Sequence, residues 1–199
     1  MGNRIRRVEV ADAEAIRAIY APFITESATS FEADVPDRDE MARRIEADAD
    51  RYPWLVFERD HEVIGYAYAS PHRARKAYQW SAEVSVYVDV RAHRRGVGRA
   101  LYTALFELLR QQRYVNAFAG ITLPNPSSVG LHESFGFVPV GVFKQIGFKF
   151  DQWHDVGWLH LRLRDDPRPV SDPLPTAGLW GDEKVTALFE TCAQSVRMG

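Results

Sequence analysis

Cysteine is almost missing from this chain: Cys192 is the only one among 199 residues. A single thiol cannot form an internal disulfide bond, and it excludes a zinc site built from several cysteines. Cys192 also lies in the C-terminal tail, which makes it a poor candidate for a catalytic nucleophile. No group of His, Asp or Glu residues has the spacing of metal ligands, so we predict no metal site.

Long apolar runs and an excess of one charge are missing as well. No apolar stretch approaches the ~20 residues that a helix needs to cross a bilayer, and the N-terminal residues lack the apolar centre of a signal peptide. The chain has 25 Lys and Arg against 27 Asp and Glu, which leaves no cationic excess for nucleic acid. We therefore expect a cytoplasmic protein that binds neither a membrane nor nucleic acid.

The residues that are present alternate between strand and helix patterns. Apolar or alternating stretches predict strands at residues 5–8, 54–57, 63–69, 81–90, 115–121, 138–142 and 156–163. Capping residues and helical spacing predict helices after Asp12 and Asp37, after a glycine turn near residue 96, and from the turn at residues 124–128. Pro22 should kink or end the first of them. This order predicts an α/β domain in which helices cover the faces of a mixed sheet.

A proline-rich segment follows this domain. Four prolines lie between Asp165 and Pro175, a composition typical of linkers. We expect one domain over residues 1–164, and a linker with a C-terminal tail over residues 165–199. In the tail, Val185, Leu188 and Phe189 have helical spacing. Two outcomes stay open: the tail docks on the domain or on a partner chain, or it is disordered.

Residues 83–100 are the most informative segment. An apolar strand leads into a basic turn, Arg94-Arg95-Gly96-Val97-Gly98-Arg99, and a long amphipathic helix follows. Glycine lets the backbone approach a ligand, and a helix N-terminus presents unpaired N–H groups to an anion. This arrangement suits a pyrophosphate. Taken alone, the turn is equally typical of a basic loop that caps a surface helix.

Six further segments give residues 3–163 a resemblance to a known family. They are RYPWLV (51–56), RKAYQW (75–80), EVSVYV (83–88), LPNPS (123–127), LHE (131–133) and WHDVG (153–157). With the glycine turn, they are similar to the GNAT family of acetyl-CoA-dependent N-acetyltransferases, and most similar to its phosphinothricin (or methionine sulfoximine) acetyltransferase branch. The resemblance implies the GNAT fold: a mixed, mostly antiparallel sheet flanked by helices, whose splayed central strands bind acetyl-CoA. His93 is a departure, since the wider family usually has Gln or Arg there.

The resemblance also implies a binding site for the cosubstrate acetyl-CoA. The pantetheine arm would lie along the strand that precedes the glycine turn, and the turn would hold the pyrophosphate. Asn125 matches the asparagine that binds the CoA arm in the family. The implied cofactor-binding residues are Val86, Tyr87, Val88, Arg94, Arg95, Gly96, Val97, Gly98, Arg99, Asn125 and Ser128.

Two side chains are candidates for acid–base chemistry. Acetylation needs a base, because a free aliphatic amine is mostly protonated at neutral pH. Glu83 lies in an apolar strand, where a partly buried carboxylate is suited to take the proton; alternatively it faces solvent on an edge strand or pairs with an arginine. His132 matches the branch and can relay a proton or protonate the leaving CoA thiolate; alternatively it is an ordinary half-buried histidine. The sequence leaves open which is the principal base.

A small amino acid with an acidic tail needs cationic groups and an apolar wall. Candidate substrate-binding residues are Phe31, Glu32, Arg75, Tyr78, Lys149 and Trp153. Arg75 and Lys149 are equally interpretable as plain surface charges. The remaining histidines, including His72, are expected to be turn or strand-face residues without a catalytic role. By resemblance, the protein forms a homodimer in which the partner chain helps to close the substrate site.

The resulting expectation is an N-acetyltransferase that acylates the α-amine of a small amino acid of phosphinothricin, methionine sulfoximine or methionine sulfone type. Two alternatives stay open. One is an enzyme of the same fold that acts on protein N-termini or lysines, and the other is a CoA-binding module that has lost catalysis. Turnover on small amino acids, on peptides or on no amine distinguishes the three.

Overall fold

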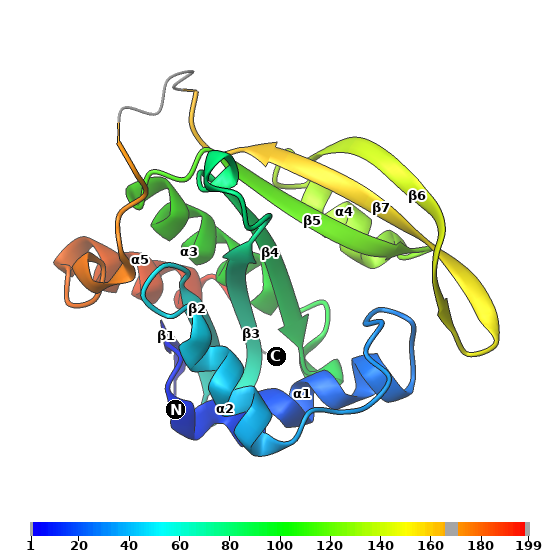
Figure 1. Ribbon diagram of the computed structural model, residues 1–199. Helices are drawn as coiled ribbons and strands as arrows, with labels where there is room; N and C mark the ends of the chain where they lie inside the picture. Colours follow the sequence, from blue (N-terminus) through cyan, green and yellow to red (C-terminus); the bar gives the residue numbers. More distant parts are fainter. Residues whose placement is uncertain (1, 166–170, 198–199) are drawn as a thin grey trace.

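The structure is a computed structural model that describes residues 2–165 and 171–197 (Figure 1). In this part of the chain, seven strands form a sheet in the order β1-β2-β3-β4-β5-β7-β6. β4 and β5 are parallel, and the other neighbours are antiparallel. The strands are β1 (Asn3–Arg7), β2 (Trp54–Arg59), β3 (Glu62–Pro71), β4 (Ser81–Val88), β5 (Asn116–Leu123), β6 (Val138–Lys149) and β7 (Gln152–Arg162).

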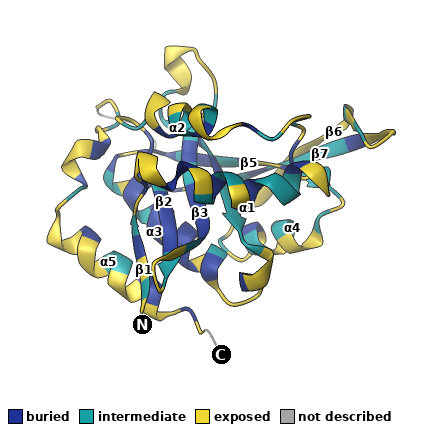
Figure 2. Cartoon of the chain, turned by 90° about the horizontal axis from the view of Figure 1, so that it is seen from below, coloured by how far each residue is buried: buried dark blue, intermediate teal, exposed yellow. Residues whose placement is uncertain are grey.

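Helices cover both faces of the sheet, α1 and α2 on one face and α3 and α5 on the other (Figures 1 and 2). Successive side chains of a strand point to opposite faces, so Val56 packs against α1 and α2 while Leu55 and Phe57 pack against α3. The helices are α1 (Ala13–Thr25), α2 (Arg38–Ala47), α3 (Val97–Gln111), α4 (Pro126–Glu133) and α5 (Glu183–Gln194). None of them, in the part of the chain described, is long and apolar enough to cross a membrane.

α3 anchors the glycine turn to the larger core. Leu101, Leu105, Leu108 and Leu109, which have the spacing of one helix face, are all completely buried. Each buried leucine stabilises the fold by roughly 1.5–3 kcal/mol. The position of the turn relative to β4 is therefore set by core packing.

The β6–β7 hairpin is longer than predicted. The sequence predicts that residues 138–142 begin a strand, that Lys149 and Trp153 lie in a loop, and that a last strand covers 156–163, whereas β6 runs to Lys149 and β7 begins at Gln152. Most of β6 is exposed and its register against β7 shifts twice, so no alternation of buried and exposed residues marks it. Lys149 and Trp153 thus lie on strands rather than in a loop. In α1, Pro22 stands in the last turn, and the helix ends at Thr25.

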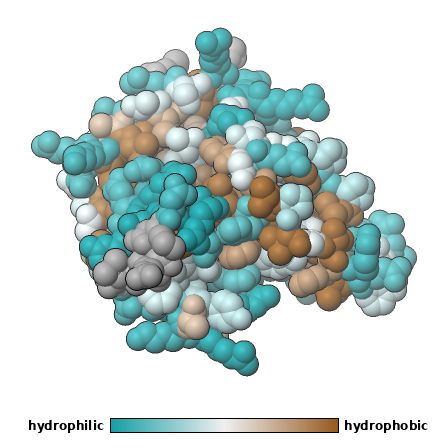
Figure 3. Space-filling view, turned by 90° about the horizontal axis from the view of Figure 1, so that it is seen from above, coloured by the Kyte–Doolittle hydropathy of each residue, from teal (hydrophilic) through white to brown (hydrophobic). Residues whose placement is uncertain are grey.

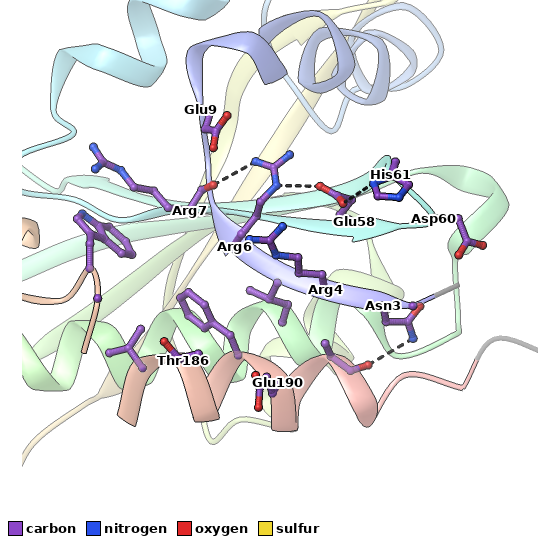
Figure 4. A pocket seen from close by; sticks show the side chains of 17 residues that line it. Asn3, Arg4, Arg6, Arg7, Glu9, Glu58, Asp60, His61, Thr186 and Glu190 are labelled. Carbon is purple, nitrogen blue, oxygen red and sulfur yellow. Dashed lines mark hydrogen bonds and ion pairs between the residues drawn. The ribbon is translucent and has the colours of Figure 1, made fainter. Parts of the chain in front are cut away.

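The C-terminal tail docks on its own chain. α5 packs against β1 and α3, and Val185, Cys192 and Ala193 are buried there. The Asn3 amide donates hydrogen bonds to the carbonyl oxygens of Ala193 (3.4 Å) and Val196 (3.2 Å). Figure 4 shows the hollow of about 930 Å³ between β1 and α5. Burial raises the pKa of the Cys192 thiol, which makes it unreactive as a nucleophile.

The expected domain boundary at residue 164 stays a prediction. Of the expected linker, residues 166–170 lie outside the described residues.

Candidate functional site

The sheet opens between β4 and β5. Ser81–Glu83 of β4 pair with Asn116–Phe118 of β5, and the pairing of described residues ends there, while β5 continues along β7 as far as Leu123. A cleft of about 70 Å³ follows, lined by residues 84–87 of β4 and 119–122 of β5. Backbone groups of β4 that face the cleft have no strand partner among the described residues. This is the setting in which an extended ligand adds to a sheet.

The glycine turn places a helix N-terminus just after β4. Gly96 is the N-cap of α3 with a φ of 91°, a left-handed conformation that favours glycine. No atom lies within 4 Å of the position of a Cβ on Gly96, so a ligand can approach the backbone there. Gly98, in contrast, packs against β4 and α4 at ordinary contact distances. The His93 Nε2 lies 2.9 Å from the Val88 carbonyl oxygen, a contact that braces the turn against β4.

The three arginines of the turn have different surroundings. Arg99 donates a hydrogen bond to the Ser134 hydroxyl at 2.8 Å and lies over the Phe135 ring, so it connects α3 to the end of α4. Arg95 lines a separate hollow of about 300 Å³. Arg94 has no hydrogen bond or ion pair with another described residue. Arg95 is likewise exposed and has no such partner, so the charges of Arg94 and Arg95 are both available to a ligand.

α4 brings polar groups to the cleft. The Asn125 Oδ1 accepts a hydrogen bond from the Ser128 N–H at 3.1 Å, so the residue predicted to contact CoA also caps α4. Asn125, Ser128 and His132 all line the cleft. The cap therefore fixes the position of these three residues relative to β4.

His132 is buried, and both of its ring nitrogens are engaged. Nδ1 lies 2.8 Å from the Ser128 carbonyl oxygen, and Nε2 lies 3.1 Å from the Tyr102 hydroxyl. Since a carbonyl oxygen only accepts, Nδ1 carries the proton, and Tyr102 donates to Nε2 of the neutral ring. Burial lowers the pKa of His132 and raises the pKa of Tyr102. Tyr102, which also lines the cleft, was missed by the sequence because it lies on the apolar face of α3.

Glu83 lies at the closed end of the cleft. It is the last β4 residue paired with β5, and its side chain is 30% exposed. Its Oε1 lies 3.0 Å from Nδ1 of His72 and 3.7 Å from Nη1 of Arg73. β4 lies between β3 and β5, so the alternative that Glu83 faces solvent on an edge strand is wrong. The alternative that Glu83 pairs with an arginine is confirmed for Arg73, and Glu83 also pairs with His72. His72 lies in the bend after β3, as predicted for a turn residue, and its ring stacks on Phe118 beside this carboxylate.

Glu32 belongs to a polar network on the α1–α2 side of the sheet. Its carboxylate accepts hydrogen bonds from Arg44 at 2.7 Å and 3.1 Å and from the Tyr20 hydroxyl at 2.9 Å. Arg44 and Tyr20 come from α2 and α1, and no sequence pattern distinguishes them from ordinary helix residues. A substrate amine near Glu32 would have to share the carboxylate with Arg44.

Phe31 and Lys149 join the loop after α1 to the β6–β7 hairpin. Lys149 Nζ donates a hydrogen bond to the Ser30 carbonyl oxygen at 2.6 Å. The Phe31 ring lies against the backbone of Gly147, where a Cβ would overlap it. Lys149 therefore has a structural partner, and Phe31 is held where it can form a wall.

The other predicted substrate residues are not all brought together. The Tyr78 ring lies 6.1 Å from the His72 ring and so is near Glu83. Arg75 is exposed, and its side chain has no hydrogen bond or ion pair with another described residue. Trp153 is 59% exposed, and its ring contacts Phe148 on the hairpin. In residues 2–165 and 171–197, no group of three or more His, Cys, Asp or Glu is placed to hold a metal ion.

Comparison with known proteins identifies the same domain. The acetyltransferase (GNAT) domain model matches residues 5–158. A phosphinothricin N-acetyltransferase from Streptomyces viridochromogenes is 40% identical over 168 residues, which are 83% of this chain and 92% of that protein. An L-methionine sulfoximine/L-methionine sulfone acetyltransferase from Salmonella typhimurium is 32% identical over 166 residues, which are 83% of this chain and 97% of that protein.

A solved structure agrees with these relatives. The crystal structure of a GNAT superfamily phosphinothricin acetyltransferase from Sinorhizobium meliloti, in complex with acetyl-CoA, matches with a TM-score of 0.79 and 31% identity. The match covers 92% of this chain and 98% of that one. The diverging strands β4 and β5 and the glycine turn before α3 lie within residues 5–158, which match the GNAT domain model. The chain therefore belongs to the GNAT family of N-acetyltransferases.

Proposed function

We propose that this enzyme transfers the acetyl group of acetyl-CoA to the α-amine of a small amino acid of phosphinothricin, methionine sulfoximine or methionine sulfone type. The observation that carries the proposal is the position of Glu83, which ends the β4–β5 pairing and directly precedes Val84 at the start of the cleft. The similar proteins named for these amino acids support the substrate class. Resistance to phosphinothricin would be one consequence of such an activity.

The residues around the cleft suit acetyl-CoA. Val86 offers backbone groups without a strand partner to the pantetheine arm, whereas those of Tyr87, which also borders the cleft, face Tyr66 of β3. The open backbone at Gly96 and the charge of Arg94 suit the pyrophosphate, and Asn125 borders the same cleft. Bound there, acetyl-CoA supplies an activated acetyl thioester.

Glu83 is the base in this proposal. A carboxylate within hydrogen-bond reach of the amine, directly or through one water, removes its proton and frees the lone pair for attack on the acetyl carbon. Unpaired N–H groups of β4 are suited to stabilise the charge that develops on the acetyl oxygen. The chemistry requires no covalent enzyme intermediate, in agreement with the burial of Cys192 in α5.

We assign the return of a proton to the leaving group to His132 and Tyr102, which line the cleft together. A thiol has an ordinary pKa of about 8.5, so a leaving thiolate needs less help than the attacking amine. Loss of His132 should therefore lower turnover less than loss of Glu83.

We also propose that the β6–β7 hairpin is covered by a second copy of the chain. Large apolar side chains of the hairpin, which include Val142, Phe143, Ile146, Phe148 and Trp153, are 45% to 59% exposed, and Figure 3 shows apolar residues gathered on this side. β6 is also an edge strand. Exposed apolar patches of this kind mark interfaces, and the patch begins beside the Phe31 wall.

The test is acetyl-CoA consumption, read as free thiol release, with phosphinothricin, methionine sulfoximine, methionine sulfone and a panel of short peptides. Glu83→Gln keeps the shape of the side chain and removes the base, so turnover on the small amino acids should fall by about 10²–10⁴-fold. Glu133→Gln, the same change at an exposed position on α4, is the matched control and should leave turnover unchanged.

Three outcomes would contradict parts of the proposal. Turnover on peptides alone would overturn the substrate class. Unchanged turnover in Glu83→Gln would overturn the base. A rise in melting temperature with acetyl-CoA, without turnover on any amine, would favour a binding module.

A further inference from the structure

His72 lies over the Glu83 side chain because of the way β3 ends. Ser70 of β3 pairs with Glu83, and Pro71 is the last residue of that strand. On its other side, Glu83 pairs with Phe118 of β5, so the Glu83 and Phe118 side chains are neighbours on one face of the sheet. The chain leaves β3 at His72, and the imidazole lies on this pair.

Aromatic rings hold the imidazole in place. It stacks on Phe118 with ring centroids 4.4 Å apart and planes 12° apart. The rings of Trp158 (5.9 Å) and Tyr78 (6.1 Å) meet it edge to face, each at 72°. The His72 side chain is only 14% exposed. A ring packed in this way has little freedom to turn, so the direction of its N–H group is set.

The hydrogen bond to Glu83 identifies the proton on this ring. The His72 Nδ1 lies 3.0 Å from Oε1 of Glu83, and a carboxylate oxygen accepts, so Nδ1 carries a hydrogen. Arg73 approaches the same oxygen at 3.7 Å. Among the described residues, no hydrogen bond involves Oε2 of Glu83. One carboxylate oxygen is thus tied to the protein, and the other is available to an amine.

We propose that His72 is a positioning residue for Glu83: it holds Oε1, and so orients Oε2 toward the incoming amine. The inference rests on the proposed role of Glu83 as the base. Positioning matters because a misplacement of about 1 Å can lower a rate by about 10²-fold. A plain packing role for the ring is the competing explanation, and it predicts that the N–H group is dispensable.

Two substitutions separate these explanations. His72→Phe keeps a ring to stack on Phe118 and removes the N–H group. His72→Asn loses the ring but keeps an N–H donor at nearly the same distance from Cβ. We expect His72→Phe to lower kcat by about 10–100-fold with an unchanged KM for acetyl-CoA, and His72→Asn to retain more of kcat than His72→Phe. Equal or faster turnover in His72→Phe than in His72→Asn would overturn the proposal.

His160→Phe is a matched control. His160 also stacks on Phe118, at 4.9 Å, but its Nε2 lies 3.0 Å from the Asn116 Oδ1 and makes no contact with Glu83. This variant should keep kcat within about 2-fold of the wild type, since Phe keeps the stack on Phe118 and the hydrogen bond that is lost goes to Asn116 rather than to Glu83. A loss equal to that of His72→Phe would show that packing around Phe118 is the cause.

A double substitution distinguishes failure of this inference from failure of the proposed function. If His72 acts through Glu83, adding His72→Phe to Glu83→Gln should cost nothing further. Additive losses would overturn the inference and leave the base intact. Normal kcat in His72→Phe beside a collapsed Glu83→Gln would do the same, whereas normal kcat in Glu83→Gln would refute the base itself.

Discussion

The fold keeps His132 uncharged by burying its ring between Ser128 and Tyr102. Burial lowers its pKa below the ordinary 6.5, which the unfolded chain retains. Between the two values the unfolded state binds more protons. The free energy of unfolding is therefore fully retained above about pH 6.5, and it falls as the pH drops toward the folded-state pKa.

We expect the urea midpoint of the wild type to fall between about pH 7.5 and about pH 5.5, and that of His132→Gln to fall less over the same interval. The pKa of His160 is also lowered by burial, so His160→Gln measures how much of the fall in the urea midpoint is due to His160. Carboxylates with a lowered pKa, such as Asp12 and Asp155, titrate below this window. Equal losses in the wild type and in His132→Gln would contradict the assignment.

At the scale of elements, the β6–β7 hairpin and the loop after α1 are in direct contact, and we propose that together they form one wall of the substrate site. The Phe31 ring occupies the space beside Gly147 that a Cβ would need, and Lys149 holds the Ser30 carbonyl oxygen. Gly147 is not among the glycines with a positive φ, so its backbone conformation is open to alanine. The glycine is needed for the close approach of Phe31.

Gly147→Ala should therefore displace the Phe31 ring without unfolding the protein. We expect the KM for the amino acid to rise by about 10-fold, which is about 1.4 kcal/mol, while the KM for acetyl-CoA stays unchanged. Gly141→Ala in the same strand, where a Cβ meets nothing within 4 Å, is the control. Identical KM values for the amino acid in Gly147→Ala and Gly141→Ala would refute the proposal that Phe31 forms a wall of the substrate site.

At the scale of the whole molecule, we propose that a second copy of the chain covers the exposed apolar side chains of the β6–β7 hairpin. Phe148 is 58% exposed on the edge strand β6. We expect the wild type to have the mass of a dimer in light scattering, and Phe148→Glu to shift it toward the monomer, because a charge cannot be buried unpaired in an apolar interface. Val90→Glu, at a residue 73% exposed away from the hairpin, should leave the mass unchanged. A monomeric wild type would contradict the proposed dimer.

Much of the fold was predictable because the buried faces of helices and strands require apolar residues at regular spacing along the chain. The leucines of α3 repeat at helical spacing, and residues 115–121 alternate as a half-buried strand does. The full length of β6 was not predicted, because most of its residues are exposed and so show no alternation of apolar and polar side chains. For the cofactor side, the glycine turn and Asn125 lie in short motifs whose local geometry does not depend on distant residues.

The sequence by itself determined the α/β class, the GNAT resemblance and the candidate carboxylate, because each depends on the pattern of residues within short segments of the chain. Only the tertiary structure decided that His72 holds Glu83, that Phe31 rests on Gly147, and that α5 docks on β1. These contacts join residues that lie on different elements. They depend on strand register and on the packing of one element against another, and such relations leave no pattern along the chain.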